Sequence, residues 1–272
     1  MRLHILCFVL SFLFAQCSTP TGEHHPEWEK YFDEYHVPGC ITIYDLTNSR
    51  FIDYNADRCT QRFIPASTFK IPNSIIALET KVIPDTSFVI KWDSVVRRSE
   101  SWNRDQSMQD AFHHSAVWYY QEIAKKVGVE KYQYYLNLFH YGNMNPGGAL
   151  DSFWLTGDLR ISCDEQVEFL KNFYSYQLRV SKRTIDLVKG MMLLEKNPAY
   201  TFSGKTGWGM MDSEEQPGKQ KNIGWLVGYV EKGTEVYFFA LNIESPEPSP
   251  ADFAASREKI ARDCLRAAGI IP

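Results

Sequence analysis

A serine and a lysine three residues apart, Ser67 and Lys70, carry the clearest chemistry in the sequence. The stretch 65–70 has the pattern of a helix start, and positions i and i+3 of a helix share a face, so the hydroxyl and the amine can meet. A neutral lysine, or a derivative of it, can take the serine proton and create a nucleophile. Free N–H groups at a helix N-terminus would stabilise an oxyanion there. The ordinary alternative is a capping serine beside a solvated lysine.

Further polar residues could act on the same ligand. Lys205 and Thr206 lie at the predicted end of a strand, where they could hold an anionic group, and Gly207 allows close backbone approach. A phosphate loop is set aside because Ala199 stands where that motif needs a glycine. A solvated lysine at a strand end remains the alternative. Ser115 supplies another hydroxyl at a predicted helix start.

Two residues with ordinary structural explanations also enter the prediction. Arg257 follows Ser256, the expected cap of the last helix, and either pairs with Asp252 or Glu258 at the surface or grips an anionic ligand. Trp154 is most simply a core residue, although its indole N–H would still need a partner.

Metal binding is not expected from the histidines or cysteines. The histidines at 24–25 and 113–114 are adjacent pairs whose side chains would point apart, and no Cys-x-x-Cys pair occurs. Cys40 and Cys59 are expected on two adjacent strands, as a cross-strand disulfide or, slightly favoured, as two buried thiols. Cys163 and Cys264 complete the predicted mature set.

Secondary-structure patterns place these residues in an α+β fold. Residues 40–44 and 50–54 read as an antiparallel pair, and 200–206, 222–231 and 235–243 read as three more strands. Between them, about 65–198 is mostly helical, with Pro72 predicting a kinked or 3₁₀ first turn. A helix over 117–127 ends at Gly128, and Ser162 begins a capping box. We expect an antiparallel sheet flanked by helices, with the helical region inserted between its strands.

The ends and the overall charge indicate an exported globular protein. The chain has 272 residues, 44% hydrophobic, with a net charge of −4, so a nucleic-acid surface is not indicated. Arg2 and the apolar run 5–15 predict a signal peptide ending near residue 17, with one domain over 18–272. Either signal peptidase cleaves around 15–17, or Cys17 carries a lipid anchor.

Eight motifs follow one another along nearly the whole predicted mature chain. They are Pro65–Asn73, Trp102–Gln106, Ser115–Trp118, Tyr141–Asn143, Phe153–Leu155, Glu165–Val167, Lys205–Trp208 and Gly224–Gly228. In these motifs the chain resembles the class D, or oxacillinase-type, β-lactamases. This family is related to the class A enzymes and penicillin-binding proteins, which also pair Ser-x-x-Lys with Lys-Thr-Gly. The acidic stretch 211–220 is a mild departure that bears on substrate range.

The resemblance implies a mechanism for β-lactam hydrolysis, and thus for antibiotic resistance. Ser67 would form an acyl-enzyme, and Lys70, carboxylated on its amine by CO₂, would act as general base. Trp154 would donate its indole N–H to that carbamate. Ser115, helped by Lys205, would pass a proton to the lactam nitrogen.

The other implied roles concern binding and surroundings. The backbone N–H groups of Ser67 and Trp208 would form the oxyanion hole. No metal or organic cofactor is implied beyond CO₂ or bicarbonate. Lys205, Thr206 and Arg257 would bind the substrate carboxylate, and the lysine pocket would be kept dry by Val117, Phe69 and Leu155.

Two alternatives differ from the hydrolase in the fate of the acyl group. A β-lactam sensor domain would stay acylated, but such domains follow several membrane spans, and here a single signal peptide is predicted. A penicillin-binding transpeptidase or carboxypeptidase would act on cell-wall peptides, but Trp154 and the motif 141–143 resemble class D. We expect a periplasmic enzyme with a small-molecule β-lactam substrate, touching the membrane only through an anchor at Cys17. The sequence does not predict the oligomeric state or the preferred β-lactam class.

Overall fold

The structure is a computed structural model of the whole chain, and it describes residues 22–213 and 216–272. The predicted signal peptide, with Cys17, lies outside these residues. Among the residues described, no helix combines the length and apolarity needed to cross a bilayer.

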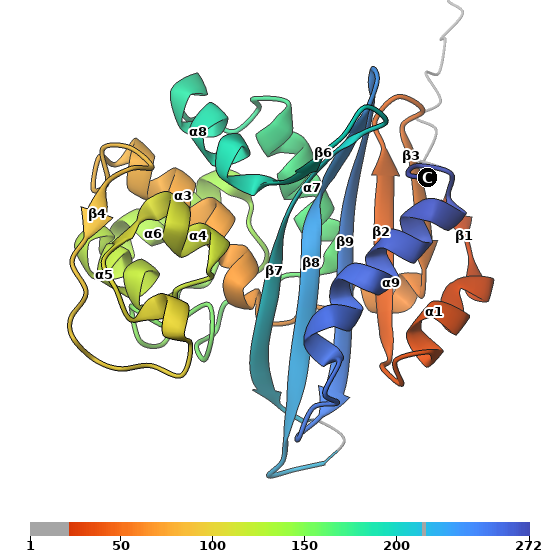
Figure 1. Cartoon of the computed structure of the whole chain (residues 1–272), viewed down its shortest axis with the longest axis horizontal. Coiled ribbons are helices and arrows are strands. Elements are labelled where there is room, and N and C mark those ends of the chain that lie inside the picture. Colours follow the sequence, from red (N-terminus) through yellow and green to blue (C-terminus); the bar gives the residue numbers. More distant parts are fainter. Residues whose placement is uncertain (1–21, 214–215) are drawn as a thin grey trace, which may run out of the picture.

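A seven-stranded sheet forms the centre of the molecule (Figure 1), in the order β1-β3-β2-β9-β8-β7-β6. All neighbouring pairs are antiparallel, as expected, except β1 and β3, which run parallel. The strands are β1 (Gly22–His24), β2 (Gly39–Asp45), β3 (Arg50–Tyr54), β6 (Leu193–Lys196), β7 (Thr201–Asp212), β8 (Gln220–Lys232) and β9 (Glu235–Pro246).

The two faces of the sheet pack into different cores because successive strand residues point to opposite sides. On β2, Ile41 and Ile43 face a core shared with α1 (Glu29–Asp33) and α9 (Phe253–Ala267). Cys40 and Tyr44 face the other core, which includes α7 (Cys163–Tyr174) and the helical region. Figure 1 shows α9 crossing the near face of the sheet, with α7 behind it.

Most of the helical region lies beside β7 in Figure 1, although its helix α7 lies behind the sheet, and the region comes between β3 and β6 in the chain, as predicted. Its helices are α2 (Ala56–Cys59), α3 (Lys70–Glu79), α4 (Met108–His113), α5 (Val117–Val127), α6 (Val129–Phe139), α7 and α8 (Lys182–Met192). A small two-stranded sheet of β4 (Val89–Ile90) and β5 (Gln106–Ser107) interrupts them. The α5 bounds, the stop at Gly128 and the capping box at Ser162 are confirmed.

The helix after Pro65 begins as a 3₁₀ turn, η2 (Ala66–Phe69), and continues as α3, as the position of Pro72 predicted. Strand β7 packs closely against this turn, and Gly207 makes the approach possible. A Cβ on Gly207 would lie 3.1 Å from Thr68 Cγ2 and 3.2 Å from the Pro65 carbonyl oxygen. Larger residues would therefore push the strand away from the turn that carries Ser67.

Several local predictions were wrong. Ser256 does not cap α9, because the helix begins at Phe253 after Asp252, and the Ser256 hydroxyl donates to the Phe253 carbonyl instead. Lys205 lies inside β7, which extends to Asp212, and not at a strand end. Cys59 lies on α2 and not on a strand, because the polar segment after β3 turns into a short helix. All four described cysteines are free and buried, so Cys40 and Cys59 form no disulfide.

Candidate active site

Ser67 and Lys70 meet as their spacing predicted. The Lys70 Nζ donates a hydrogen bond of 2.9 Å to the Ser67 Oγ, and both side chains are buried. Ser67 sits in the 3₁₀ turn and Lys70 begins α3, so the change of helix type brings the two onto one face. Ala66 takes a positive φ of 48° just before the serine, and its N–H donates to the Trp154 carbonyl. A tertiary contact thus holds the strained residue in place.

Buried hydrogen bonds fix the 3₁₀ turn from behind. The Thr68 hydroxyl donates to the Pro65 carbonyl at 2.7 Å, and Gln166 on α7 donates its amide to the Thr68 Oγ at 2.9 Å. Because Thr68 adjoins Ser67, these contacts limit the movement of the serine backbone.

Lys70 is held in conditions that favour its neutral form. Its side chain is 1% exposed, and burial, with a smaller contribution from the Lys205 charge, holds the pKa of its amine well below the usual range. Within the described chain it has no carboxylate in ion-pair range. A buried lysine without a counter-ion loses its proton more readily, so the amine can act as a base or nucleophile.

Lys205 links β7 to Ser115. Its Nζ donates to the Ser115 Oγ at 3.0 Å and to the Thr206 carbonyl at 3.1 Å. Burial, and then the nearby Arg257 charge, lower the pKa of Lys205 to about 7. This lysine can therefore gain or lose a proton near neutral pH, next to a hydroxyl that can relay it.

Ser115 lies between α4 and α5 with a positive φ of 57°. Trp102 supports this strained position, because its indole N–H donates to the His114 carbonyl at 2.8 Å. The Trp118 indole in turn donates to the Trp102 carbonyl at 2.9 Å. The two tryptophans therefore fix the segment that presents Ser115.

Arg257 is buried beside β7, and the surface-pair explanation does not fit it. Its Nη1 donates to the Gly207 carbonyl at 2.6 Å and its Nε to the Ala254 carbonyl, with no ion pair inside the described ranges. The side chain lies in the second turn of α9 and not at its start. Burial lowers the pKa of its guanidinium to about 10. A desolvated cation without an acidic partner is suited to an anionic ligand.

A cavity of about 310 Å³ is lined by Ser67, Ser115 and Arg257, whereas Lys70 and Lys205 are connected to it through their hydrogen bonds to the two serines. Trp102 and Trp208 also border a neighbouring groove of about 740 Å³, which includes Met210 and Glu247. The cavity thus connects the Ser67 hydroxyl and the Arg257 guanidinium to a wider, partly apolar groove. The residues that line the cavity are Ser67, Trp102, Ser115, Val117, Thr206, Trp208 and Arg257.

Trp154 and Phe69 form the apolar wall near the serine turn. Their rings stack with centroids 5.5 Å apart, and both side chains are buried. In the described part of the chain the Trp154 indole N–H makes no hydrogen bond. Its expected role as a donor to a carbamate stays a prediction. Leu155 is partly buried against the same core.

Sequence reasoning missed three contributors. Trp102 entered the prediction only as part of a motif, yet it lines the cavity and holds the Ser115 segment. Tyr120 places its ring 5.1 Å from the Lys70 Nζ, and Gln166 anchors the serine turn. Tyr120 lies one helical turn after Val117, so the inward face of α5 was a signal that could have found it.

Comparisons with known proteins agree along most of the chain. Residues 32–266 match the family described as penicillin binding protein transpeptidase domain. β-Lactamase OXA-5 of Pseudomonas aeruginosa is 40% identical over 97% of this chain and 96% of its own length. β-Lactamase OXA-48 of Klebsiella pneumoniae is 38% identical over 92% and 91%.

Solved structures give the same assignment. A class D β-lactamase from Sebaldella termitidis superposes with a TM-score of 0.86 and 39% identity, covering 93% of this chain and all of that one. The C-terminal domain of the Bacillus licheniformis BlaR penicillin-receptor reaches 0.85, with 30% identity over 93% and 98% of the two chains. Sequence identity is higher to the Sebaldella enzyme than to the receptor. The chain therefore belongs to the class D serine β-lactamases, which are hydrolases.

Proposed function

We propose that this protein hydrolyses the β-lactam ring of penicillin-type antibiotics through an acyl-enzyme on Ser67, with carboxylated Lys70 as general base, and so confers resistance to them. One observation carries the proposal: a buried lysine, with no carboxylate in range among the described residues, donates to a serine hydroxyl that lines a cavity together with the buried Arg257. The names of the relatives support the substrate class.

Acylation uses Ser67, Lys70 and Ser115. Lys70 in its carboxylated form accepts the proton of Ser67, whose oxygen then attacks the lactam carbonyl carbon. The C–N bond of the ring breaks, and the departing nitrogen takes a proton from Ser115. Lys205, at 3.0 Å, resupplies that proton. The backbone N–H groups of Ser67 and Trp208 stabilise the oxyanion.

Deacylation repeats the base step with water. The proton that Lys70 took from Ser67 during acylation first passes to Lys205, which gave one up through Ser115. Lys70 then accepts a proton from a water molecule that attacks the ester carbon and returns it to Ser67 as the C–O bond breaks. Val117, Phe69 and Leu155 keep bulk water from the lysine, so that its protonation follows the local site and not the solvent.

The substrate carboxylate is bound by Lys205, Thr206 and Arg257. Both cations are buried and lie next to Gly207, and neither has an acidic partner among the described residues. A carboxylate would accept charge-assisted hydrogen bonds from them. The groove beyond Trp102 and Trp208 has room for the rest of the antibiotic.

Carboxylation of Lys70 needs no enzyme or metal. The neutral amine attacks CO₂, forms an N–C bond and releases one proton. Burial provides the neutral amine. The product is an anion in an apolar pocket and needs donors. Ser67, which bonds to the lysine, and Trp154, whose ring stacks on Phe69, would supply them. CO₂ or bicarbonate is then the sole added requirement, without an organic cofactor.

We further propose that residues from about 18 onward form one β-lactamase/transpeptidase-like domain. This domain would be exported to the periplasm, either free or held by a lipid on Cys17. The apolar run 5–15 after Arg2 supports this proposal.

Two labelling experiments test the mechanism. After incubation with a slow substrate, mass spectrometry should place the acyl adduct on the peptide containing Ser67, and Ser67→Ala should lack both the adduct and hydrolysis. With ¹³C-labelled bicarbonate, a carbamate signal should appear in wild type and in Ser67→Ala but not in Lys70→Ala. Trp154→Phe should need more bicarbonate for the same activity. An adduct elsewhere would refute the serine assignment, and an absent carbamate signal would refute carboxylation.

The likeness to the BlaR penicillin-receptor supports a second candidate, a domain that binds penicillin and stays acylated. Turnover separates the two. Many cycles per active site on a chromogenic β-lactam support the hydrolase, whereas a single burst equal to the enzyme concentration supports the receptor.

A further inference from the structure

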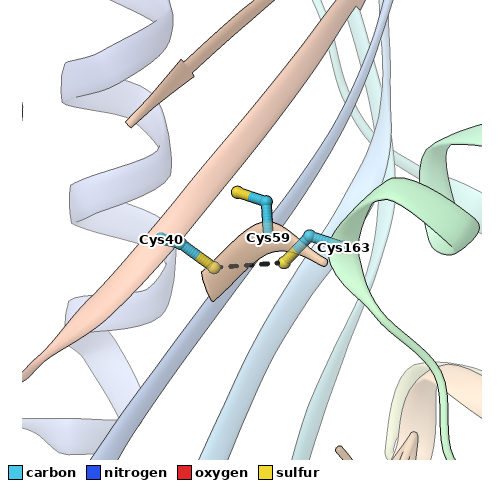
Figure 2. Close-up of side chains that lie close together, drawn as sticks. All are labelled: Cys40, Cys59 and Cys163. Carbon is cyan, nitrogen blue, oxygen red and sulfur yellow. Dashed lines mark hydrogen bonds between the residues drawn. The ribbon is translucent and has the colours of Figure 1, made fainter. Parts of the chain in front are cut away.

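Three buried cysteines from distant parts of the chain come together behind the sheet. Cys40, Cys59 and Cys163 lie on β2, α2 and the first residue of α7, and their Sγ atoms all lie within 4.8 Å of one another. Figure 2 shows the sulfurs of Cys40 and Cys163 facing each other, with Cys59 completing a triangle. The Sγ atoms of Cys40 and Cys163 are 3.5 Å apart. Within the described residues, this is the one such group of three ligating side chains.

We propose that these three thiols bind a thiophilic divalent cation of the zinc group. Zinc–sulfur bonds of about 2.3 Å in a tetrahedral site place sulfurs about 3.8 Å apart. The Cys40 and Cys163 sulfurs are 3.5 Å apart and no pair of the three exceeds 4.8 Å, so shifts of at most about 1 Å would bring the sulfurs to this spacing. Soft thiolates select metals of this kind over Mg²⁺ or Ca²⁺.

Local charge fits a divalent ion. Three thiolates and a 2+ ion leave one net negative charge, which would be costly in a buried site unless compensated. Arg58 adjoins Cys59 and donates to Asn242, the ladder partner of Cys40, at 2.7 Å. Arg58 and Lys221 share Glu244, so this group keeps one positive charge beside the thiols. The Arg58 Nε is also buried and has no hydrogen-bond partner among the described residues.

A cavity gives the ion a way in. Cys59 lines a pocket of about 350 Å³ whose wall also includes His24, Asp53 and Asp164. The two carboxylates favour cations in the pocket. A water molecule from this side can take the fourth position of a tetrahedral ion, as in zinc sites with three protein ligands. This site is separate from the catalytic cavity, because the two share no lining residue.

A disulfide is the competing fate of the same sulfurs. Oxidation would join two of them, most directly Cys40 and Cys163, and leave the third as an odd thiol. The convergence of three sulfurs from three separate elements, with a cation-attracting pocket beside one of them, favours metal coordination over a single crosslink.

Titration of the reduced, metal-free mature protein with Cd²⁺ tests the proposal. Cadmium–thiolate absorption in the ultraviolet should saturate at one ion per chain, with an intensity for three thiolates, and Zn²⁺ should compete for the site. Uptake should release thiol protons to the solution. Loss of even an outer-shell partner lowers metal affinity about 10–100-fold, so Cys40→Ser, Cys59→Ser and Cys163→Ser should each lower it by at least about 100-fold.

Cys264→Ser is the matched control, because Cys264 is a buried thiol on α9 in the other core. It should bind Cd²⁺ as wild type does. Unchanged β-lactamase activity without metal would show that each variant folds. If a variant does not fold, the number of thiolates bound to Cd²⁺ in the wild-type spectrum still tests the proposal. No saturable uptake by wild type, equal uptake by a cluster variant, or a Cys40–Cys163 disulfide found by mass spectrometry in protein isolated without reductant would overturn the proposal.

Discussion

Buried cations in two regions of this molecule differ in whether a carboxylate lies beside them. Away from the catalytic cavity, Arg58 and Glu244 form an ion pair of 2.8 Å, with both side chains only 11% exposed. Around the cavity, Lys70, Lys205 and Arg257 are at least as buried, and none has a carboxylate in range within the described chain. Their pKa values are lowered by burial, and those of the two lysines also by a neighbouring cation.

The difference separates stability from function. A paired, hydrogen-bonded cation is compatible with a buried position at little net cost, whereas unpaired cations near one another destabilise the folded chain. Proteins retain such destabilising unpaired charges mainly at sites where a ligand or a reaction needs them. In the proposed enzyme the substrate carboxylate supplies the missing anion for Lys205 and Arg257, and CO₂ converts Lys70 to an anion.

The largest expected effect is on activity at Lys70. Lys70→Ala should lower kcat for penicillin hydrolysis by about three to five orders of magnitude, because general-base help at both acylation and deacylation is lost. Steady-state kinetics with added bicarbonate measures this. Lys189→Ala is the control, since Lys189 is a partly buried lysine that donates to the Tyr174 carbonyl outside the cavity. A comparable loss in Lys189→Ala would mean that the effect is not specific to the catalytic lysine.

Substitution of one arginine from each group should have opposite consequences. Arg58→Ala should lower the free energy of unfolding by about 1.5–3 kcal/mol, because a buried charged hydrogen bond to Glu244 is lost while Lys221 still pairs with that carboxylate, and should leave KM unchanged. Arg257→Ala should raise KM about 10–100-fold for carboxylate-bearing substrates, corresponding to about 1.5–3 kcal/mol for a charged hydrogen bond, with little loss of stability. Urea unfolding and kinetics on both variants give the comparison. A loss of stability in Arg257→Ala equal to that in Arg58→Ala would remove the distinction.

Features that depend on local sequence patterns could be predicted, whereas features that depend on packing between distant segments could not. The contact between Ser67 and Lys70 could be predicted because residues three apart on a helix share a face, which depends on local spacing alone. The alternation of apolar and polar residues likewise predicted most strands of the sheet. Strands β1 and β6 were missed because they are short, and their pairing depends on distant partners. The burial of the Arg257 side chain depends on the packing of α9 against β8, and no residue spacing in the sequence predicts that packing.

The cysteine cluster was invisible for a similar reason. Cys40, Cys59 and Cys163 are separated by long, irregular intervals, so a rule based on close Cys-x-x-Cys spacing could not detect them. The fold brings them together only when β2, α2 and α7 have packed.

Lys205 should make binding depend on pH near neutrality. Its pKa is about 7, and its charged form binds the substrate carboxylate, so kcat/KM should fall up to about tenfold per pH unit above 7. Lys205→Arg should lose this alkaline limb because its charge does not titrate. Arg257→Met should move the limb to higher pH, because the neighbouring charge that lowers the pKa of Lys205 is gone. A limb that stays in place in both variants would assign it to another group.

The smallest expected effect is a gain in stability when the catalytic lysine is removed without creating a cavity. Lys70→Met keeps most of the side-chain volume and should raise the free energy of unfolding by about 0.5–2 kcal/mol in bicarbonate-free buffer. Burial lowers the pKa of Lys70 in the folded chain, whereas in the unfolded chain it is about 10.4. Between these two values the unfolded wild type binds one more proton, so wild-type stability rises with pH. The advantage of methionine should therefore be greatest near and below the folded pKa and should disappear as the pH approaches 10.4. Urea unfolding of both proteins at several pH values measures it, and an advantage that does not change with pH would show that packing, not charge burial, separates the two side chains.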